Sequence, residues 1–89
     1  MSDVTDNRGE SRYELPTDAG PSIAAYQLEG DRITFTHTVV PEEVEGHGVG
    51  SKLIAGALAD ARGHGLRVVP QCPFVATYLD KHPDAAELA

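Results

Sequence analysis

The glycine-rich segment Glu43–Leu53, with the sequence EVEGHGVGSKL, is the feature that most constrains the fold. Before it, Arg32–Val40 has a period of two and is rich in β-branched residues, which predicts a strand. After it, apolar residues from Val49 onward recur with helical spacing. The chain therefore passes from a strand into a helix through a loop in which glycine occupies alternate positions.

The rest of the sequence predicts a β-β-β-α-β-α order. Two strands are expected before Arg32–Val40, and a turn at Gly63 and Gly65 ends the first helix. Since a helical crossover returns the chain in the same direction, the last strand should lie parallel to the third. The pattern predicts an α+β fold with a mainly antiparallel sheet. The further expected strands are Ser11–Leu15, Ser22–Glu29 and Leu66–Pro70, and the last helix is expected from Pro73 to His82.

Length and charge restrict the domain organisation and the partners. The chain has 89 residues, which suits one core: residues 1–10 are expected to form a flexible arm and residues 11–89 a single domain. Its net charge of −7 argues against general nucleic-acid binding. One cysteine, no apolar run long enough for a bilayer and no hydrophobic signal-peptide core predict a cytoplasmic protein.

The three loop glycines have two interpretations. Glycine permits positive φ and close approach of a ligand, and a helix N-terminus offers unpaired N–H groups and a positive dipole end. Together they predict a phosphate cradle of main-chain amides. The alternative is a tight turn alone. The spacing fits neither a P-loop, because Gly46 and Gly50 are separated by three residues, nor the dinucleotide fingerprint, whose third glycine would fall at Ser51.

The segments around the loop resemble a known family. Glu45–Gly50 occupies the acetyl-CoA pyrophosphate motif of the GNAT superfamily of N-acetyltransferases, usually written R/Q-x-x-G-x-G/A. More closely, HTVVP, EGHGVGSKL and LRVVPQCPFVATYLDKHP resemble the small stand-alone GNAT-like proteins of the YjdJ type, from about Tyr26 to Pro83. The resemblance implies a minimal GNAT-like fold and acetyl-CoA or coenzyme A as the cofactor. Glu45 departs from the motif, in which Arg or Gln is usual.

The resemblance also implies the cofactor-binding residues. The strand before the loop would pair its backbone with the pantetheine arm, the loop amides would hold the pyrophosphate, and Cys72 would line the wedge opened by the next strand. Lys52, in the first helical turn, would offset the charge of Glu45. The implied cofactor-binding residues are Thr38, Val39, Val40, Glu45, Gly46, His47, Gly48, Val49, Gly50, Ser51, Lys52 and Cys72.

Three residues are candidates for catalysis. Cys72 precedes the last helix, whose N-terminus favours a thiolate; it would be either an acyl-accepting thiol or an apolar contact to the cofactor. His37 would take a proton from the incoming ammonium, or be a hydrogen-bonded core histidine on the apolar face of its strand. Tyr78 would protonate the leaving thiolate, as a tyrosine does in many GNAT enzymes, or pack along its own helix.

The activity implied by this resemblance is transfer of an acetyl group from acetyl-CoA to a primary amine, either a small amine or a protein lysine. The alternative is a non-catalytic module that binds coenzyme A or acyl-CoA for sensing or protein interaction. An acidic surface favours a basic acceptor, and the exposed edge of a small sheet suits a monomer or a weak homodimer. The four histidines share no metal-ligand spacing with one another or with Cys72, so no metal site is expected.

Overall fold

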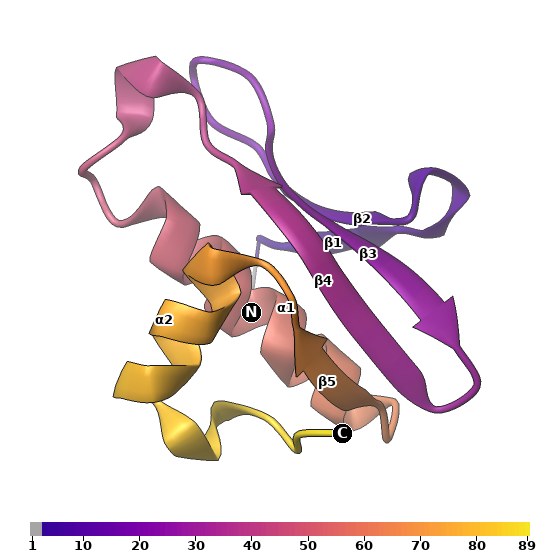
Figure 1. Cartoon of the computed structure of the whole chain (residues 1–89). Helices are drawn as coiled ribbons and strands as arrows, with labels where there is room; N and C mark the ends of the chain where they lie inside the picture. Colours follow the sequence, from indigo (N-terminus) through magenta and orange to yellow (C-terminus); the bar gives the residue numbers. More distant parts are fainter. Residues whose placement is uncertain (1–2) are drawn as a thin grey trace.

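The computed structural model of the chain describes residues 3–89, which form a five-stranded sheet and two α-helices (Figure 1). In sheet order, the strands are β1 Thr5–Asn7, β2 Arg12–Leu15, β3 Ser22–Glu29, β4 Arg32–Val39 and β5 Arg67–Pro70. The helices are α1 Val49–Gly63 and α2 Pro73–Lys81, and short 3₁₀ helices lie at Arg8–Glu10, Glu42–Val44 and Pro83–Ala85. Strands β1 to β4 pair antiparallel and β5 pairs parallel to β4, which confirms the predicted α+β fold and the parallel last pair.

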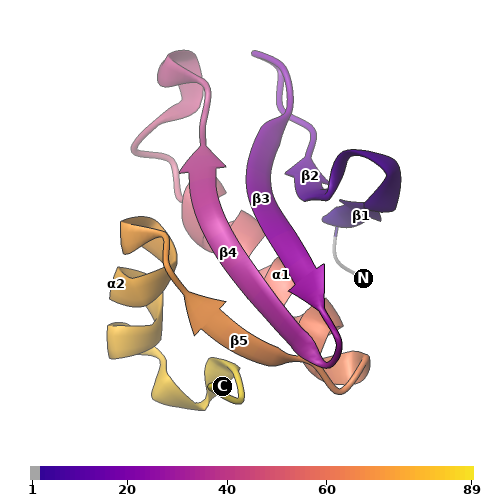
Figure 2. The same cartoon turned by 45° about the vertical axis from the view of Figure 1, so that its right-hand side comes forward.

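One face of the sheet carries the hydrophobic core. The apolar side chains of α1 recur with helical spacing on the side that faces the sheet, and α2 lies beside α1, next to β4 and β5. The opposite face carries no helix within residues 3–89 (Figure 2). No helix in this part of the chain is long and apolar enough to cross a membrane. The core includes Tyr13, Tyr26, Ile33, Phe35, Leu53, Ile54, Leu58, Val68, Val75 and Leu79.

Residues 5–10 extend the sheet and the adjoining turn instead of forming a loose arm. Strand β1 pairs with β2, and its polar side chains find partners: the Tyr26 hydroxyl donates to Asp6, and Asn7 Nδ2 donates to Glu14 Oε2 at 3.1 Å. The predicted flexible arm over residues 1–10 therefore does not describe this segment. The first two residues of that arm lie outside the described residues.

Strand β4 contains a bulge that changes the direction of its later side chains. His37 pairs with Ala25 and Phe35 pairs with Tyr26, which leaves Thr36 as an extra residue. An extra residue reverses the alternation of the faces, so Phe35 is buried whereas His37 is exposed on the face that carries no helix. The interpretation of His37 as a core histidine is therefore wrong.

Strands β4 and β5 are paired only along the first half of β4. The parallel register ends with Phe35 opposite Pro70, and the Cys72 N–H then donates to the Phe35 carbonyl at 2.8 Å as the chain turns into α2. Beyond this point, Thr36–Val39 has no β5 partner among the described residues. The unpaired edge of β4 leads towards the loop that precedes α1.

Candidate functional site

The three loop glycines are required for different physical reasons. Gly46 and Gly48 have φ of 84° and 76°, in the left-handed region where a side chain is strained. Gly50 is buried, and a Cβ added to it would lie 2.5 Å from Cζ of Phe74. Two glycines therefore shape the loop, and the third allows α2 to approach the start of α1.

The start of α1 presents backbone donors at this loop. Gly48 is the N-cap and has no side chain that could satisfy the first N–H groups. The first hydrogen bond across this end of the helix runs from the Lys52 N–H to the Gly48 carbonyl at 3.0 Å. The N–H groups of Val49–Ser51 consequently have no acceptor within the helix. Such groups, together with the helix dipole, favour an anion.

A pocket of about 450 Å³ lies between the unpaired edge of β4, the loop and α2. It brings together Thr38, near the end of β4, and Val40, which follows β4, with most of the loop residues that the resemblance implies. Val39, His47, Lys52 and Cys72 do not line it. The lining residues are Thr38, Val40, Val44, Glu45, Gly46, Gly48, Val49, Gly50, Ser51 and Phe74.

Sequence reasoning missed two lining residues, Val44 and Phe74. Val44 ends the 3₁₀ helix that follows β4, and an apolar residue between acidic neighbours gives no local signal of a pocket. Phe74 lies in the first turn of α2, 41% exposed, with its ring against Gly50. The sequence signal for Phe74 was Gly50, a glycine at a core position of α1, because a glycine there leaves room for a bulky side chain.

Cys72 lies behind the pocket. Its side chain is only 3% exposed, and its Sγ is 3.4 Å from Oγ1 of Thr38, which does line the pocket. Cys72 is also the N-cap of α2, and its side chain makes no capping bond there. The thiol therefore contacts the pocket through Thr38, at the end where β4 and β5 diverge.

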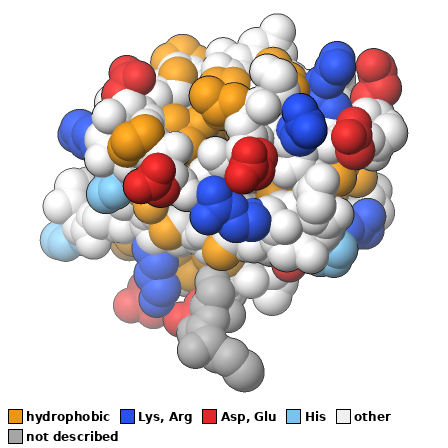
Figure 3. Space-filling view, turned by 90° about the horizontal axis from the view of Figure 1, so that it is seen from below, with side chains coloured by type: hydrophobic (Ala, Val, Ile, Leu, Met, Phe, Trp, Pro, Cys, Tyr) orange, Lys and Arg blue, Asp and Glu red, His pale blue; other side chains and the backbone are white. Residues whose placement is uncertain are grey.

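The pocket offers backbone donors without cationic side chains. Among the described residues that line it there is no Lys, Arg or His, and Glu45 adds a carboxylate. Lys52 lies outside the lining, and its Nζ pairs with Asp3 Oδ2 at 3.0 Å. Two further acidic residues, Glu42 and Glu43, precede the loop. The face of the molecule seen from below differs, because acidic and basic side chains are interspersed on it (Figure 3). An anion in the pocket would be held by amides.

The other two catalytic candidates lie apart from this pocket. His37 is on the helix-free face of the sheet, with its Nδ1 3.3 Å from Oγ1 of Thr36. Tyr78 lies on α2, where its ring packs against His82 with the centroids 4.5 Å apart. Tyr78 lines a neighbouring groove instead of the pocket. The structure therefore does not bring Cys72, His37 and Tyr78 together in one cavity among the described residues.

The sheet order, the diverging β4 and β5, and the glycine loop before α1 define a GNAT-type acyltransferase fold. The family model described as GCN5-related N-acetyl-transferase matches residues 12–88, so the chain belongs to this family. It is similar to the solution NMR structure of a GCN5-like candidate N-acetyltransferase from Staphylococcus aureus, with a TM-score of 0.70 and 27% identity. That match covers 96% of this chain and 86% of the other. No curated protein matches the chain.

Proposed function

We propose that the protein is an acetyl-CoA-dependent N-acetyltransferase that acts on a primary amine. The observation that carries the proposal is the pocket that joins the unpaired edge of β4 to the free amides at the start of α1. Amide donors in a glycine loop suit a pyrophosphate, and an extended strand edge suits the amide groups of a pantetheine arm. Membership of the GCN5-related family supports acetyl transfer in general.

Different residues along the pocket would bind different parts of acetyl-CoA. The amides of residues 45–51 would bind the phosphates, with Gly46 and Gly48 holding the loop open for them. Thr38 and Val40 would orient the arm along β4, and Cys72 would close the wall behind Thr38. Acetyl-CoA would supply an acyl group activated as a thioester. Because Cys72 is buried and does not line the pocket, we assign it a packing role behind Thr38 and not a nucleophilic role.

The acceptor would approach from the helix-free face of the sheet. His37 is exposed on that face and would accept the proton that an ammonium must lose before it attacks. No helix within residues 3–89 walls this side, so a lysine on a flexible basic segment has access to it. The net charge of −7 would attract such a segment. We do not assign Tyr78 the acid role, since it lines the neighbouring groove.

Calorimetric titration with acetyl-CoA tests the proposal. We expect saturable binding that is at least about tenfold weaker in Gly48→Glu, because a carboxylate at this position of positive φ would repel a phosphate. Gly65→Glu is the matched control: Gly65 also has positive φ and open space around its Cβ, but it follows α1 at the far end of the helix. An equal loss of affinity for acetyl-CoA in the two variants, or no binding by the unaltered protein, would overturn the proposal.

A coenzyme A-binding module without turnover is the second candidate. It is favoured by one observation: Glu45 is the only titratable residue among the described residues that line the pocket. Transfer of labelled acetyl to lysine-containing basic peptides separates the two functions. Transfer that is lost in His37→Ala supports the enzyme, whereas tight binding without transfer to any amine supports the module.

A further inference from the structure

A second groove lies beside the pocket at the glycine loop, which we call the loop pocket, and shares a wall with it. Its volume is about 420 Å³, and its lining comes from α2 and from Ser51 of α1. Ser51 and Phe74 line both the loop pocket and this groove, which we call the α2 groove. A ligand bound at the loop amides therefore enters the α2 groove if it extends past Ser51 and the Phe74 ring.

The α2 groove has an aromatic wall. Tyr78 and His82 are one helical turn apart, and their rings pack with centroids 4.5 Å apart and planes inclined by 34°. The Phe74 ring, 41% exposed, forms the end that adjoins the loop pocket. Partly exposed rings of this kind are the surface on which a nucleobase stacks.

The α2 groove also contains a free positive charge. Lys81 lines it from the last turn of α2 and makes no ion pair among residues 3–89. The neighbouring Asp80 lines a different groove on α2. In contrast, Lys52 is paired with Asp3, and acidic residues precede the loop on its other side. A ligand with a further phosphate is therefore attracted to the α2 groove.

We propose that the α2 groove binds the adenosine 3′-phosphate end of coenzyme A, and that Lys81 recognises the 3′-phosphate. The proposal rests on the proposed function, because the pyrophosphate must lie at the loop for the adenosine to reach this groove. The adenine contacts Phe74 and Tyr78, and the 3′-phosphate pairs with the Nζ of Lys81. Lys81 is thus a specificity-determining residue outside the resemblance motif of the glycine loop.

Dephospho-coenzyme A, which lacks only the 3′-phosphate, provides the test. Calorimetry should show that the unaltered protein binds coenzyme A about fivefold or more tightly than dephospho-coenzyme A. Lys81→Met should reduce the affinity for coenzyme A to that for dephospho-coenzyme A and leave the latter unchanged. Arg62→Met is the control, because Arg62 is an exposed cation in the last turn of α1. The Arg62→Met variant should keep the preference for coenzyme A over dephospho-coenzyme A.

The results distinguish this proposal from the proposed function. If the unaltered protein binds coenzyme A but Lys81→Met changes the affinities for both ligands equally, or changes neither, the proposed role of the α2 groove is overturned. The proposed phosphate site at the loop is then unaffected. If the protein does not bind coenzyme A at all, both proposals fail. Tyr78→Leu should lower the affinities for coenzyme A and dephospho-coenzyme A by a similar factor. Unchanged affinities in this variant would overturn the stacking of adenine on α2.

Discussion

The Phe74 ring lies against the backbone of Gly50. A Cβ built on Gly50 would be 2.5 Å from Cζ of Phe74 and 3.1 and 3.2 Å from two further ring carbons. Gly50 does not have positive φ, so the backbone conformation does not require a glycine at this position. The close approach of the Phe74 ring does. Because Phe74 lines both the loop pocket and the α2 groove, the Gly50–Phe74 contact fixes the wall between them.

We expect Gly50→Ala to lower the free energy of unfolding by about 1 kcal/mol, because the added Cβ displaces the Phe74 ring, which is 41% exposed and can turn towards solvent. The displaced ring should also reduce the affinity for acetyl-CoA. Phe74→Ala removes the clash, so the double variant should be less destabilised than the sum of the two single variants. Chemical denaturation of the four proteins in a double-mutant cycle measures this coupling.

The control for this cycle is Gly63→Ala. Gly63 ends α1, and a Cβ added to it meets nothing within 4 Å. This substitution should be neutral or stabilise by up to about 1 kcal/mol, because alanine favours helix more than glycine does. Strictly additive effects of Gly50→Ala and Phe74→Ala would contradict the contact.

Much of the fold could be predicted because local pattern and tertiary structure agree. The strand at Arg32–Val39, the helix after Val49 and the parallel return at Arg67–Pro70 all appear in the structure. Positive φ at Gly46 and Gly48 agrees with the physical reason for glycine in the loop. Whether the loop binds phosphate stays a prediction.

The remaining features depend on contacts between distant segments. The bulge at Thr36 arises from the pairing of β3 with β4, so the strand period alone placed His37 on the wrong face. Strand β1 has no apolar alternation, and its side chains are held by hydrogen bonds to β2 and β3. The pairing of Lys52 with Asp3 likewise joins segments that the sequence gives no reason to connect.

Cys72→Ala should retain acetyl-CoA binding and most acetyl transfer. The thiol is 3% exposed and contacts Thr38 from behind the pocket, which suits a packing role better than that of an attacking group. The loss of a buried sulfur should cost about 1 kcal/mol in the free energy of unfolding. Single-turnover transfer and intact-protein mass spectrometry check this prediction. Acetylated Cys72 in the unaltered protein, with transfer abolished in Cys72→Ala, would instead identify a covalent nucleophile.

Asp3→Asn should strengthen acetyl-CoA binding by a factor of about two to five. The Lys52–Asp3 pair is exposed on both sides, at 58% and 70%, so it contributes at most about 1 kcal/mol to stability. Its removal frees the Lys52 ammonium, in the first turn of α1, for a phosphate at the loop. Calorimetry at two salt concentrations measures the gain, which should shrink at high salt. Lys52→Met should abolish the effect of Asp3→Asn, and a gain that persists in the double variant would rule out Lys52 as its cause.

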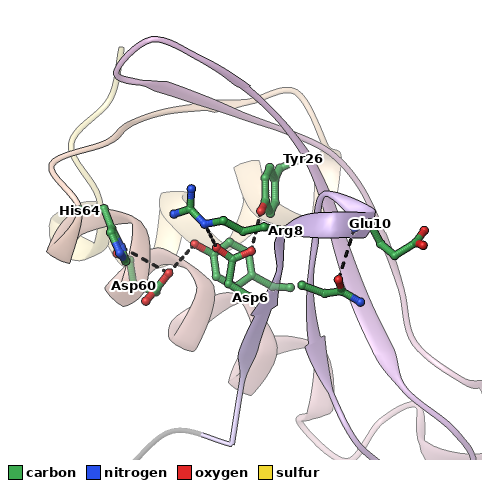
Figure 4. Close-up of polar contacts among 8 residues, drawn as sticks. Asp6, Arg8, Glu10, Tyr26, Asp60 and His64 are labelled. Atoms are coloured by element: carbon green, nitrogen blue, oxygen red, sulfur yellow. Dashed lines mark hydrogen bonds and ion pairs between the residues drawn. The ribbon is translucent and has the colours of Figure 1, made fainter.

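A tyrosine–carboxylate network joins the N-terminal strand and α1 to the core (Figure 4). The Tyr13 hydroxyl donates to Asp60 Oδ2 at 2.8 Å, and the Tyr26 hydroxyl donates to Asp6, which also pairs with Arg8. Burial, followed by the hydrogen bond to Asp6 and its negative charge, raises the pKa of Tyr26 to about 12. Burial and Asp60 also raise the pKa of Tyr13.

Alkaline pH should therefore destabilise the protein. Below pH 10, the ordinary tyrosine pKa, Tyr26 is protonated in both the folded and unfolded states, and its contribution is fully present. Between pH 10 and about 12 the unfolded chain releases this proton while the folded chain retains it, so the free energy of unfolding falls. Urea denaturation across this range, with tyrosinate absorbance as the probe of ionisation, should show both changes together.

Tyr26→Phe isolates this residue from the rest of the network. It should cost about 1 kcal/mol at neutral pH, because the hydrogen bond to Asp6 is lost, and it should make the alkaline fall in stability shallower. Tyr78→Phe is the neutral-pH control: the Tyr78 hydroxyl makes no hydrogen bond within residues 3–89, so the change should be below about 0.5 kcal/mol. An alkaline profile in Tyr26→Phe identical to that of the unaltered protein would show that the raised pKa of Tyr26 is not what couples stability to pH.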